Sequence, residues 1–439
     1  MKNNRYDIAV IGAGASGLMA AIAAGQRAPE ASVILLEKNP RPAAKLLATG
    51  NGRCNYLNKN AAASSFYTAA QPSNRVLPTV LAQGAGPLIC DFRQLGIEPF
   101  EEEEGRLYPR SLQAASVVRA LVSGAERFGA ELCCGFAVSS LKPQDGGYVI
   151  TSQEGETVTA SQVILALGGK AGIAFGTCGD GYRMARELGL KVEKPVPALT
   201  KLVAAESLQA LAGVRVKGSV RLLEVSSKEE RLVAEDRGEL QFTEDCLSGI
   251  CTFNVSRFYL IFDGASYVAR LDLLEEYSRE ELALLLKKRQ QLFAQEPCGM
   301  LLMGLLPARL CSCLLETEGL PVEKEEPEHQ KRVKQRKPSV CCEKQVLCRQ
   351  LSTQTVESLA QKIKAFDVPL AGTRSWKDAQ VTSGGISLEE VAPDTLESIR
   401  YPGLYFAGEV LDADGPCGGF NLTWAFASGK AAGLAAAER

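Results

Sequence analysis

Residues 6–17 read YDIAVIGAGASG, a short β-branched apolar run that leads directly into a G-x-G-x-x-G turn. A segment with helical apolar spacing follows over 18–26, and a second apolar run, 33–36, ends in Glu37. The order of strand, glycine turn, helix, strand and acid is the fingerprint of a dinucleotide-binding βαβ unit. A βαβ unit without a nucleotide is the alternative reading of the same pattern.

Each glycine of this turn has a physical task. Gly12 permits the tight turn, Gly14 lets the backbone approach a pyrophosphate, and Gly17 lets the helix pack closely on the strand. The free N–H groups at the start of the helix then face the phosphates. Glu37 is placed to accept hydrogen bonds from the adenosine ribose and would repel a 2′-phosphate, which argues against NADP at this site. FAD and NAD both remain open here.

The segment after Glu37 is rich in glycine, amide and cationic residues and reads KNPRPAAKLLATGNGRCN over 38–55. It can fold back over an extended ligand. Lys45 or Arg53 would then offset phosphate charge, and the backbone of residues 50–52 would lie against a planar ring. An ordinary surface loop explains the same composition equally well.

The far end of the chain carries a second glycine-rich region. Residues 401–409, YPGLYFAGE, predict a turn and a strand that ends beside Glu409, which we expect to bind ligand hydroxyls. A loop over 412–421 follows, and Asn421 is expected to cap a closing helix over 422–438. The positive end of that helix would stabilise negative charge on the N1–C2 carbonyl side of a flavin. FAD is long enough to touch both chain ends.

A third strand, SQVILALGG over 161–169, also ends in glycines and precedes Asp180, which is either a ribose contact or a helix cap.

Two features of the composition exclude other catalytic chemistries. The only histidine is His329, so histidine pairs and Ser-His-Asp triads are nearly excluded. The 14 cysteines contain no C-x2-C pair, so we expect reduced thiols and no metal, although a metal in the cysteine-rich insert stays open.

The composition is that of a soluble protein. Of 439 residues, 46% are hydrophobic and 23% charged, and the net charge is −2. Neither nucleic acid nor an anionic membrane is therefore expected as the main partner. The apolar run 8–24 is read as a buried strand and helix, not as a membrane span. A cytoplasmic location is expected, and the oligomeric state is left open.

Several stretches resemble a bacterial family of FAD-dependent oxidoreductases, the aminoacetone-oxidase-family FAD-binding enzymes, which includes the bile-acid-inducible flavoprotein reductase. They are DIAVIGAGASGLMAA, KLLATGNGRCN, GRLYPRSLQAASVVRAL, VILALGG, GTCGDGYRMA, AQVTSGGISLEEV and GLYFAGEVLDADGPCGGFNLTWAFASGKAAG. The resemblance implies an α/β fold: a Rossmann-type FAD-binding domain built from both chain ends, with an inserted β-barrel-like and helical domain. The expected parts are 1–194, the insert 195–352, and 353–439.

The motifs and the resemblance together assign FAD contacts to a set of residues spread over both chain ends. These are Gly12, Gly14, Ala15, Ser16, Gly17, Glu37, Lys38, Lys45, Gly50, Asn51, Gly52, Asn55, Val138, Ala166, Gly168, Gly408, Glu409, Phe420, Asn421 and Leu422.

The expected activity is that of a FAD-dependent oxidoreductase. Hydride would pass from NAD(P)H through flavin N5 to an unsaturated or carbonyl-containing small molecule. Because no second nicotinamide fingerprint is visible, NAD(P)H is expected to bind only transiently. The proton donor is unknown, and the candidates are Arg53, Cys54, Tyr108 and Thr382; a packing role would also explain Cys54 and Tyr108.

Two other functions remain open. One is a FAD-dependent oxidase that uses dioxygen. The other is a non-redox FAD-containing protein that binds RNA through the charged run 323–337, although a solvated helix or linker explains this run as well. The substrate and the choice between NADH and NADPH are not determined by the sequence.

Overall fold

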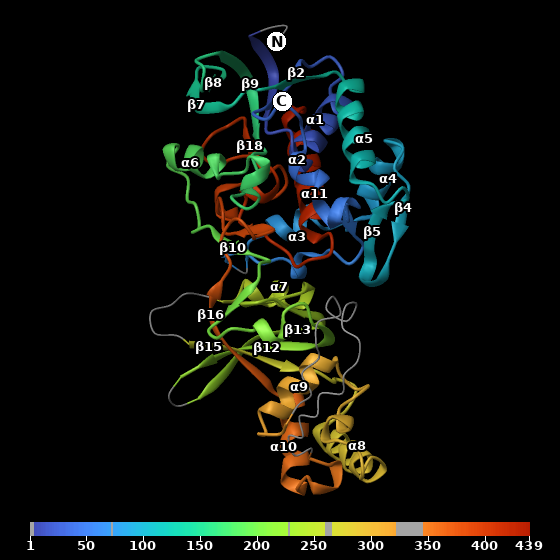
Figure 1. Cartoon of the computed structure of the whole chain (residues 1–439). Coiled ribbons are helices and arrows are strands. Elements are labelled where there is room, and N and C mark those ends of the chain that lie inside the picture. Colours follow the sequence, from blue (N-terminus) through green and yellow to red (C-terminus); the bar gives the residue numbers. More distant parts are fainter. Residues whose placement is uncertain (1–3, 72, 227–228, 260–265, 322–345) are drawn as a thin grey trace, which may run out of the picture. The chain divides into compact units, whose positions relative to one another are not determined.

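The computed structural model describes residues 4–71, 73–226, 229–259, 266–321 and 346–439. The chain forms two compact units, shown in Figure 1: Met1–Leu199 with Ser375–Arg439, and Thr200–Arg374. The expected return to the first unit at residue 353 therefore differs from the division observed at residue 375. His329, Cys341, Cys342 and the charged run 323–337 lie outside the described residues.

The core of the first unit is a sheet of seven strands in the order β6-β2-β1-β9-β8-β7, with β18 also paired to β9. The strands β6, β2, β1, β9 and β18 are parallel, and β8 and β7 are antiparallel. All five residues of β2 are buried, as expected for a parallel strand covered on both faces. The bounds are β1 Arg5–Ile11, β2 Val33–Glu37, β6 Ala130–Cys134, β7 Val138–Gln144, β8 Gly147–Ser152, β9 Thr157–Leu165 and β18 Leu404–Phe406.

The first and last helices of the chain lie side by side in this unit, as the blue and red ribbons of Figure 1 show. α1 spans Ala15–Arg27 and α11 spans Phe420–Ala436. A Cβ atom added at Gly429 would lie 2.3 Å from the Ser16 carbonyl oxygen, and one at Gly433 would lie 2.3 Å from that of Ala20. Only glycine permits this backbone-to-backbone approach, which brings the two ends of the chain together.

Shorter elements complete the first unit. Its other helices are α2 Ala44–Leu47, α3 Val76–Val80, α4 Gly86–Gln94, α5 Ala114–Arg127 and α6 Asp180–Glu187. Its small sheets are β3 Leu57–Asn58, β5 Arg106–Pro109 and β4 Pro99–Glu101, and the pair β10 Val196–Ala198 and β17 Val381–Ser383.

The second unit contains a closed barrel in the order β11-β14-β13-β12-β15-β16, which confirms the predicted β-barrel-like insert. Gly218 pairs with Gly238 in the long β12–β13 hairpin, and a Cβ at Gly218 would lie 2.2 Å from the Asp272 carbonyl oxygen. Glycine here permits a close approach between the backbones of neighbouring strands. The strands are β11 Leu202–Ala204, β12 Arg215–Val225, β13 Glu230–Phe242, β14 Cys246–Ser248, β15 Ser266–Asp272 and β16 Phe366–Thr373.

The predicted helical part of the insert is also present. The helices are α7 Ile250–Ser256, α8 Arg279–Leu292, α9 Ala308–Glu316 and α10 Thr353–Lys364. α10 and β16 belong to this unit because β16 pairs with β11 and β15 and so completes the barrel. These long-range pairings explain why the unit extends beyond residue 352.

Two further observations concern the described residues alone. Among them, no helix combines the length and apolar character that crossing a bilayer requires. Within the same part of the chain, histidine, cysteine and acidic side chains do not gather in threes at a position that would hold a metal ion.

Candidate dinucleotide-binding site

The three glycines of the first turn differ in what surrounds them. A Cβ added at Gly12, whose φ is +104°, would lie 2.5 Å from the Ala166 carbonyl oxygen, and one at Gly17 would lie 1.8 Å from that of Gly12. Packing within the protein therefore requires both. A Cβ at Gly14 would meet no heavy atom within 4 Å, and its φ of −82° suits any residue. Open space over Gly14 fits the approach of a pyrophosphate to this backbone.

Glu37 ends β2 beside this turn, and only 7% of the residue is exposed. Its two carboxylate oxygens accept hydrogen bonds from the backbone N–H groups of Ala13 and Asn39, each at 2.9 Å. A carboxylate has about four acceptor positions, so this fixed group can still accept from ribose hydroxyls. The N–H of Phe136 donates to the Glu37 carbonyl, which brings the start of β7, and with it Val138, to the same edge.

The second chain end meets the first turn directly. A Cβ at Gly408 would lie 2.5 Å from the Ser16 hydroxyl oxygen. The N–H of Gly408 donates to the Ser428 hydroxyl at 2.9 Å, and the indole of Trp424 donates to the Gly408 carbonyl at 3.1 Å. Two side chains of α11 thus hold this glycine against the start of α1, so both glycine-rich ends border one site.

The start of α11 differs from the sequence prediction. Gly419, with a φ of +94°, is the N-cap, and Asn421 lies inside the first turn. The Asn421 side chain accepts from the N–H of Gly415 at 2.9 Å and donates to its carbonyl at 2.8 Å, so it shapes the preceding loop. Phe420, Asn421 and Leu422 then carry the first N–H groups of the helix, which have no acceptor within it.

Two lysines among the expected FAD contacts, of which Lys45 was expected to offset phosphate charge, are paired with acids. Lys45 Nζ lies 2.7 Å from Glu409 Oε2, and Glu409 Oε1 accepts from the N–H of Thr382 at 2.7 Å. Lys38 Nζ lies 2.8 Å from Asp180 Oδ2, an ion pair that raises the pKa of the lysine although its partial burial acts in the opposite direction. The charges of Lys45 and Glu409 are therefore balanced by each other, a pairing that the sequence did not indicate.

The loop between these elements turns sharply. Gly50, Asn51 and Gly52 have φ values of +55°, +53° and +83°, in the left-handed region, and Asn51 and Gly52 are exposed. The loop ends at Asn55, whose Oδ1 is buried and has no hydrogen-bond partner. An open glycine turn that ends beside an unsatisfied buried acceptor fits a ligand that brings its own polar groups.

The end of β9 completes the site. Ala166 donates its N–H to the Ile11 carbonyl at 2.9 Å, and Gly168 has a φ of +70°. Sequence reasoning missed Gly169, where a Cβ would lie 2.4 Å from the Thr382 hydroxyl and 2.6 Å from Glu409 Oε1. The double glycine in the sequence was the only available signal for this close approach.

Of the four candidates for proton donation, two lie together at the loop. The guanidinium of Arg53 stacks 4.4 Å from the centre of the Tyr108 ring and forms an ion pair with Glu102. Tyr108 in turn packs against Gly50, where a Cβ would lie 3.5 Å from the Tyr108 ring. Burial raises the pKa of Tyr108, so its hydroxyl keeps its proton at neutral pH.

The other two candidates, Cys54 and Thr382, are buried within the protein. Cys54 is fully buried, and burial raises its pKa to about 11, so this thiol has no exposed surface and stays protonated at neutral pH, as a packed side chain does. The Thr382 hydroxyl is buried and accepts the N–H groups of Lys170 at 2.7 Å and Ala171 at 3.0 Å. It thereby anchors the loop that follows β9.

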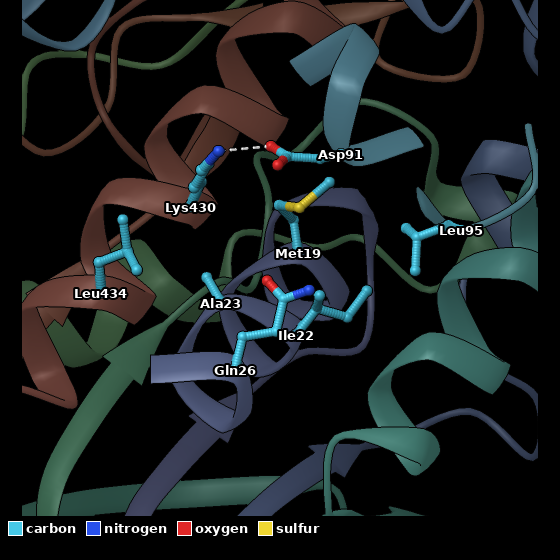
Figure 2. A pocket seen from close by; sticks show the side chains of 8 residues that line it. All are labelled: Met19, Ile22, Ala23, Gln26, Asp91, Leu95, Lys430 and Leu434. Atoms are coloured by element: carbon cyan, nitrogen blue, oxygen red, sulfur yellow. Dashed lines mark hydrogen bonds and ion pairs between the residues drawn. The ribbon is translucent and has the colours of Figure 1, made fainter. Parts of the chain in front are cut away.

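A small cavity between α1, α4 and α11 is separate from these residues (Figure 2). It measures about 50 Å³, and its walls include Met19, Ile22 and Leu95 beside the Asp91–Lys430 ion pair, at 2.6 Å. Ligand pockets typically measure roughly 300–1,000 Å³. This cavity is therefore too small to be the dinucleotide site.

Comparison with known proteins agrees with this arrangement. The family model described as the HI0933-like protein Rossmann domain matches residues 6–435. The chain belongs to the HI0933-like family of FAD-binding Rossmann proteins. This confirms the family resemblance seen in the sequence.

Individual relatives extend over the whole chain. The chain is 36% identical to the 3-dehydro-bile acid delta(4,6)-reductase of Clostridium scindens, over 98% of this chain and 99% of the relative. It is 27% identical to the ribosomal RNA dihydrouridine synthase of Escherichia coli, over 97% of this chain and 96% of that relative. Among solved structures, the open conformation of a flavocytochrome c3 fumarate reductase has a TM-score of 0.50 at 16% identity, covering 99% of this chain and 78% of that one. This last likeness concerns the fold alone.

Proposed function

We propose that this HI0933-like protein is a FAD-dependent oxidoreductase that uses NAD(P)H to reduce a carbon–carbon double bond conjugated to a carbonyl group in a small molecule. The observation that carries the proposal is the 36% identity to a bile acid reductase over 98% of this chain and 99% of that enzyme. Such a span covers both the glycine-lined site and the barrel unit. In the reaction, NAD(P)H and one proton are consumed, and the double bond becomes a single bond with two new C–H bonds.

The residues of the first unit suit this chemistry. Glu37 would hold the adenosine ribose of FAD. The open backbone at Gly14 and the first turn of α1 would hold the pyrophosphate. The Gly50–Gly52 loop and the start of α11 would hold the ring system. FAD, when bound, supplies hydride acceptance and donation. The chain must then supply a proton to the carbon next to the carbonyl. Tyr108, which keeps its proton, and Arg53 beside it are the candidates that the local geometry leaves for this role.

Reduction of uridine in ribosomal RNA is the second candidate, and it rests on the 27% identity to the E. coli dihydrouridine synthase. The reaction class is the same, because the uracil double bond is conjugated to a ring carbonyl. The net charge of −2 favours a small molecule over a polyanion, because nucleic-acid binding depends largely on phosphate neutralisation by basic residues.

Anaerobic stopped-flow spectroscopy tests the proposal. The purified yellow protein is mixed with NADH or NADPH, and we expect its absorbance near 450 nm to bleach, about where oxidised flavins absorb. A 3-oxo-Δ4,6 steroid acid is then added; we expect the colour to return and the product to gain two hydrogen atoms by mass spectrometry. The matched control is the same diene with a 3-hydroxyl group, whose double bonds are not conjugated to a carbonyl and should not react.

Other electron acceptors separate the alternatives. Reoxidation by uridine-containing ribosomal RNA, but not by the steroid, would favour the second candidate. Reoxidation by dioxygen alone would indicate an oxidase. A protein that stays oxidised with both nicotinamides, or that takes up no FAD, would contradict the proposal.

A further inference from the structure

Two asparagines at the end of the loop, three residues apart, have different surroundings. Asn58 is fully used by the protein: its Nδ2 donates to the Gly418 carbonyl at 2.7 Å, and its Oδ1 accepts from the N–H of Asn60 at 2.8 Å. Asn55 is partly exposed as a residue, but its Oδ1 is buried and has no partner. Both side chains lie near residues 418–419, just before α11. The difference in hydrogen bonding between Asn55 and Asn58 therefore does not arise from a difference in their neighbouring segments.

The position of the unpaired oxygen is well defined. A Cβ added at Gly419 would lie 2.7 Å from Asn55 Oδ1, and one at Gly50 would lie 3.2 Å from the Asn55 nitrogen. The oxygen therefore stands where the Gly50–Gly52 turn meets the cap of α11. A buried acceptor without a donor costs free energy, and native proteins rarely keep one unless a ligand or a water satisfies it.

The chemistry next to this oxygen narrows the choice of donor. The first N–H groups of α11, at Phe420, Asn421 and Leu422, have no acceptor inside the helix. The protein thus offers donors and, beside them, one buried acceptor. The pyrimidine edge of an oxidised isoalloxazine ring has the complementary pattern: one N–H, at N3, between two carbonyl oxygens. Adenosine, by contrast, belongs at the opposite end of the site, with Glu37.

We propose that Asn55 Oδ1 is the acceptor for the N3–H of the flavin ring and so fixes the orientation of the ring in the site. The assignment rests on the proposed FAD site and adds a specific ring contact to it. It makes Asn55 a residue that recognises one atom of the cofactor, whereas Asn58 is a structural residue of the same loop.

The test compares FAD with 3-methyl-FAD, which lacks this donor, by fluorescence titration of the apoprotein. The wild-type protein should bind 3-methyl-FAD at least roughly tenfold more weakly than FAD, the effect of leaving one buried acceptor unpaired. Asn55→Leu should bind FAD roughly tenfold more weakly than the wild type and should no longer distinguish the two cofactors. Asn58→Ala, the matched control, should keep the wild-type ratio of the two affinities even if its melting temperature falls.

Each result decides the matter. Equal affinities of the wild-type protein for the two cofactors, as expected if Asn55 met a ribityl hydroxyl, would overturn the assignment while leaving the FAD site intact. A full wild-type preference in Asn55→Leu would also overturn it, because the penalty would then be steric. Should Asn55→Leu fail to fold, Asn55→Ala, which also lacks a side-chain acceptor, gives the same comparison. A wild-type protein that takes up no FAD would overturn the FAD site itself.

Discussion

Replacing Gly14 by alanine should separate cofactor binding from folding. The added Cβ would meet no protein atom within 4 Å, and the backbone there is already in a region that alanine adopts. The remaining cost is that of alanine at the N-cap of α1, about 1 kcal/mol. The methyl group would nevertheless occupy the space over the turn that the pyrophosphate requires. Loss of one charge-assisted hydrogen bond, at ~1.5 kcal/mol, weakens FAD binding by roughly tenfold.

Gly17→Ala is the matched control for this prediction. Its Cβ would lie 1.8 Å from the Gly12 carbonyl oxygen, so the turn itself must deform, and we expect a loss of more than ~3 kcal/mol in the free energy of unfolding. Urea denaturation of the apoproteins measures stability, and quenching of FAD fluorescence measures affinity. The reasoning would be refuted if Gly14→Ala bound FAD as tightly as the wild type, or if it lost as much stability as Gly17→Ala.

Three further predictions follow from the same geometry. Gly433→Ala should lower the free energy of unfolding by ~1–3 kcal/mol, because its Cβ would lie 2.3 Å from the α1 backbone. The control, Gly86→Ala, adds a Cβ in open space and should change that free energy by less than ~0.5 kcal/mol. Equal urea midpoints for the two variants would contradict the contact between α1 and α11. Lys45→Met and Glu409→Gln should show a coupling of ~0.5–1 kcal/mol in a double-mutant cycle, since the side chains are 30% and 20% exposed; strictly additive effects would mean that the pair does not form. Burial raises the pKa of the Cys54 thiol from 9.0 to about 11 in the folded state. The resulting contribution to stability is fully present below pH 9 and is lost as the pH rises to about 11. Over this range the wild-type protein should lose up to ~2.7 kcal/mol more stability than Cys54→Ala, and parallel stability curves for the two proteins would count against the burial of this thiol.

The parts of the fold that the sequence predicted depend on short, local constraints. Gly17 is required by a contact within its own turn, with the Gly12 carbonyl oxygen, and the spacing of the three glycines is visible in the sequence. The buried strands β1 and β2 have apolar runs that only a covered parallel sheet accommodates. The Rossmann-type unit built from both chain ends and the inserted barrel were therefore predicted correctly, with the family resemblance supplying the barrel.

The errors and omissions arise from contacts between distant segments and, at Asn421, from the local geometry of one loop. Lys45 and Glu409 were each expected to contact a ligand, and the sequence did not indicate that the fold pairs them with each other across 364 positions of the chain. Asn421 is a residue type that favours helix caps, yet Gly419 takes that position and Asn421 holds the loop before it. The second unit ends at residue 374 because β16 closes the barrel, which its own sequence does not reveal.

The roles of the individual site residues remain predictions. Open space at Gly14 and the unpaired oxygen of Asn55 support a ligand at this position, and both appear only once the backbone of the two chain ends is placed together. The same holds for Arg53 and Tyr108, which the sequence offered as separate candidates and the structure stacks at 4.4 Å.

A crystal structure of the purified protein with its cofactor tests the central claim most directly. We expect continuous density for one FAD molecule that contacts the backbone at Gly14 and, at its other end, the start of α11 at Phe420–Leu422. Density for a cofactor that touches only one of these two chain ends, or that lies elsewhere in the molecule, would contradict the account.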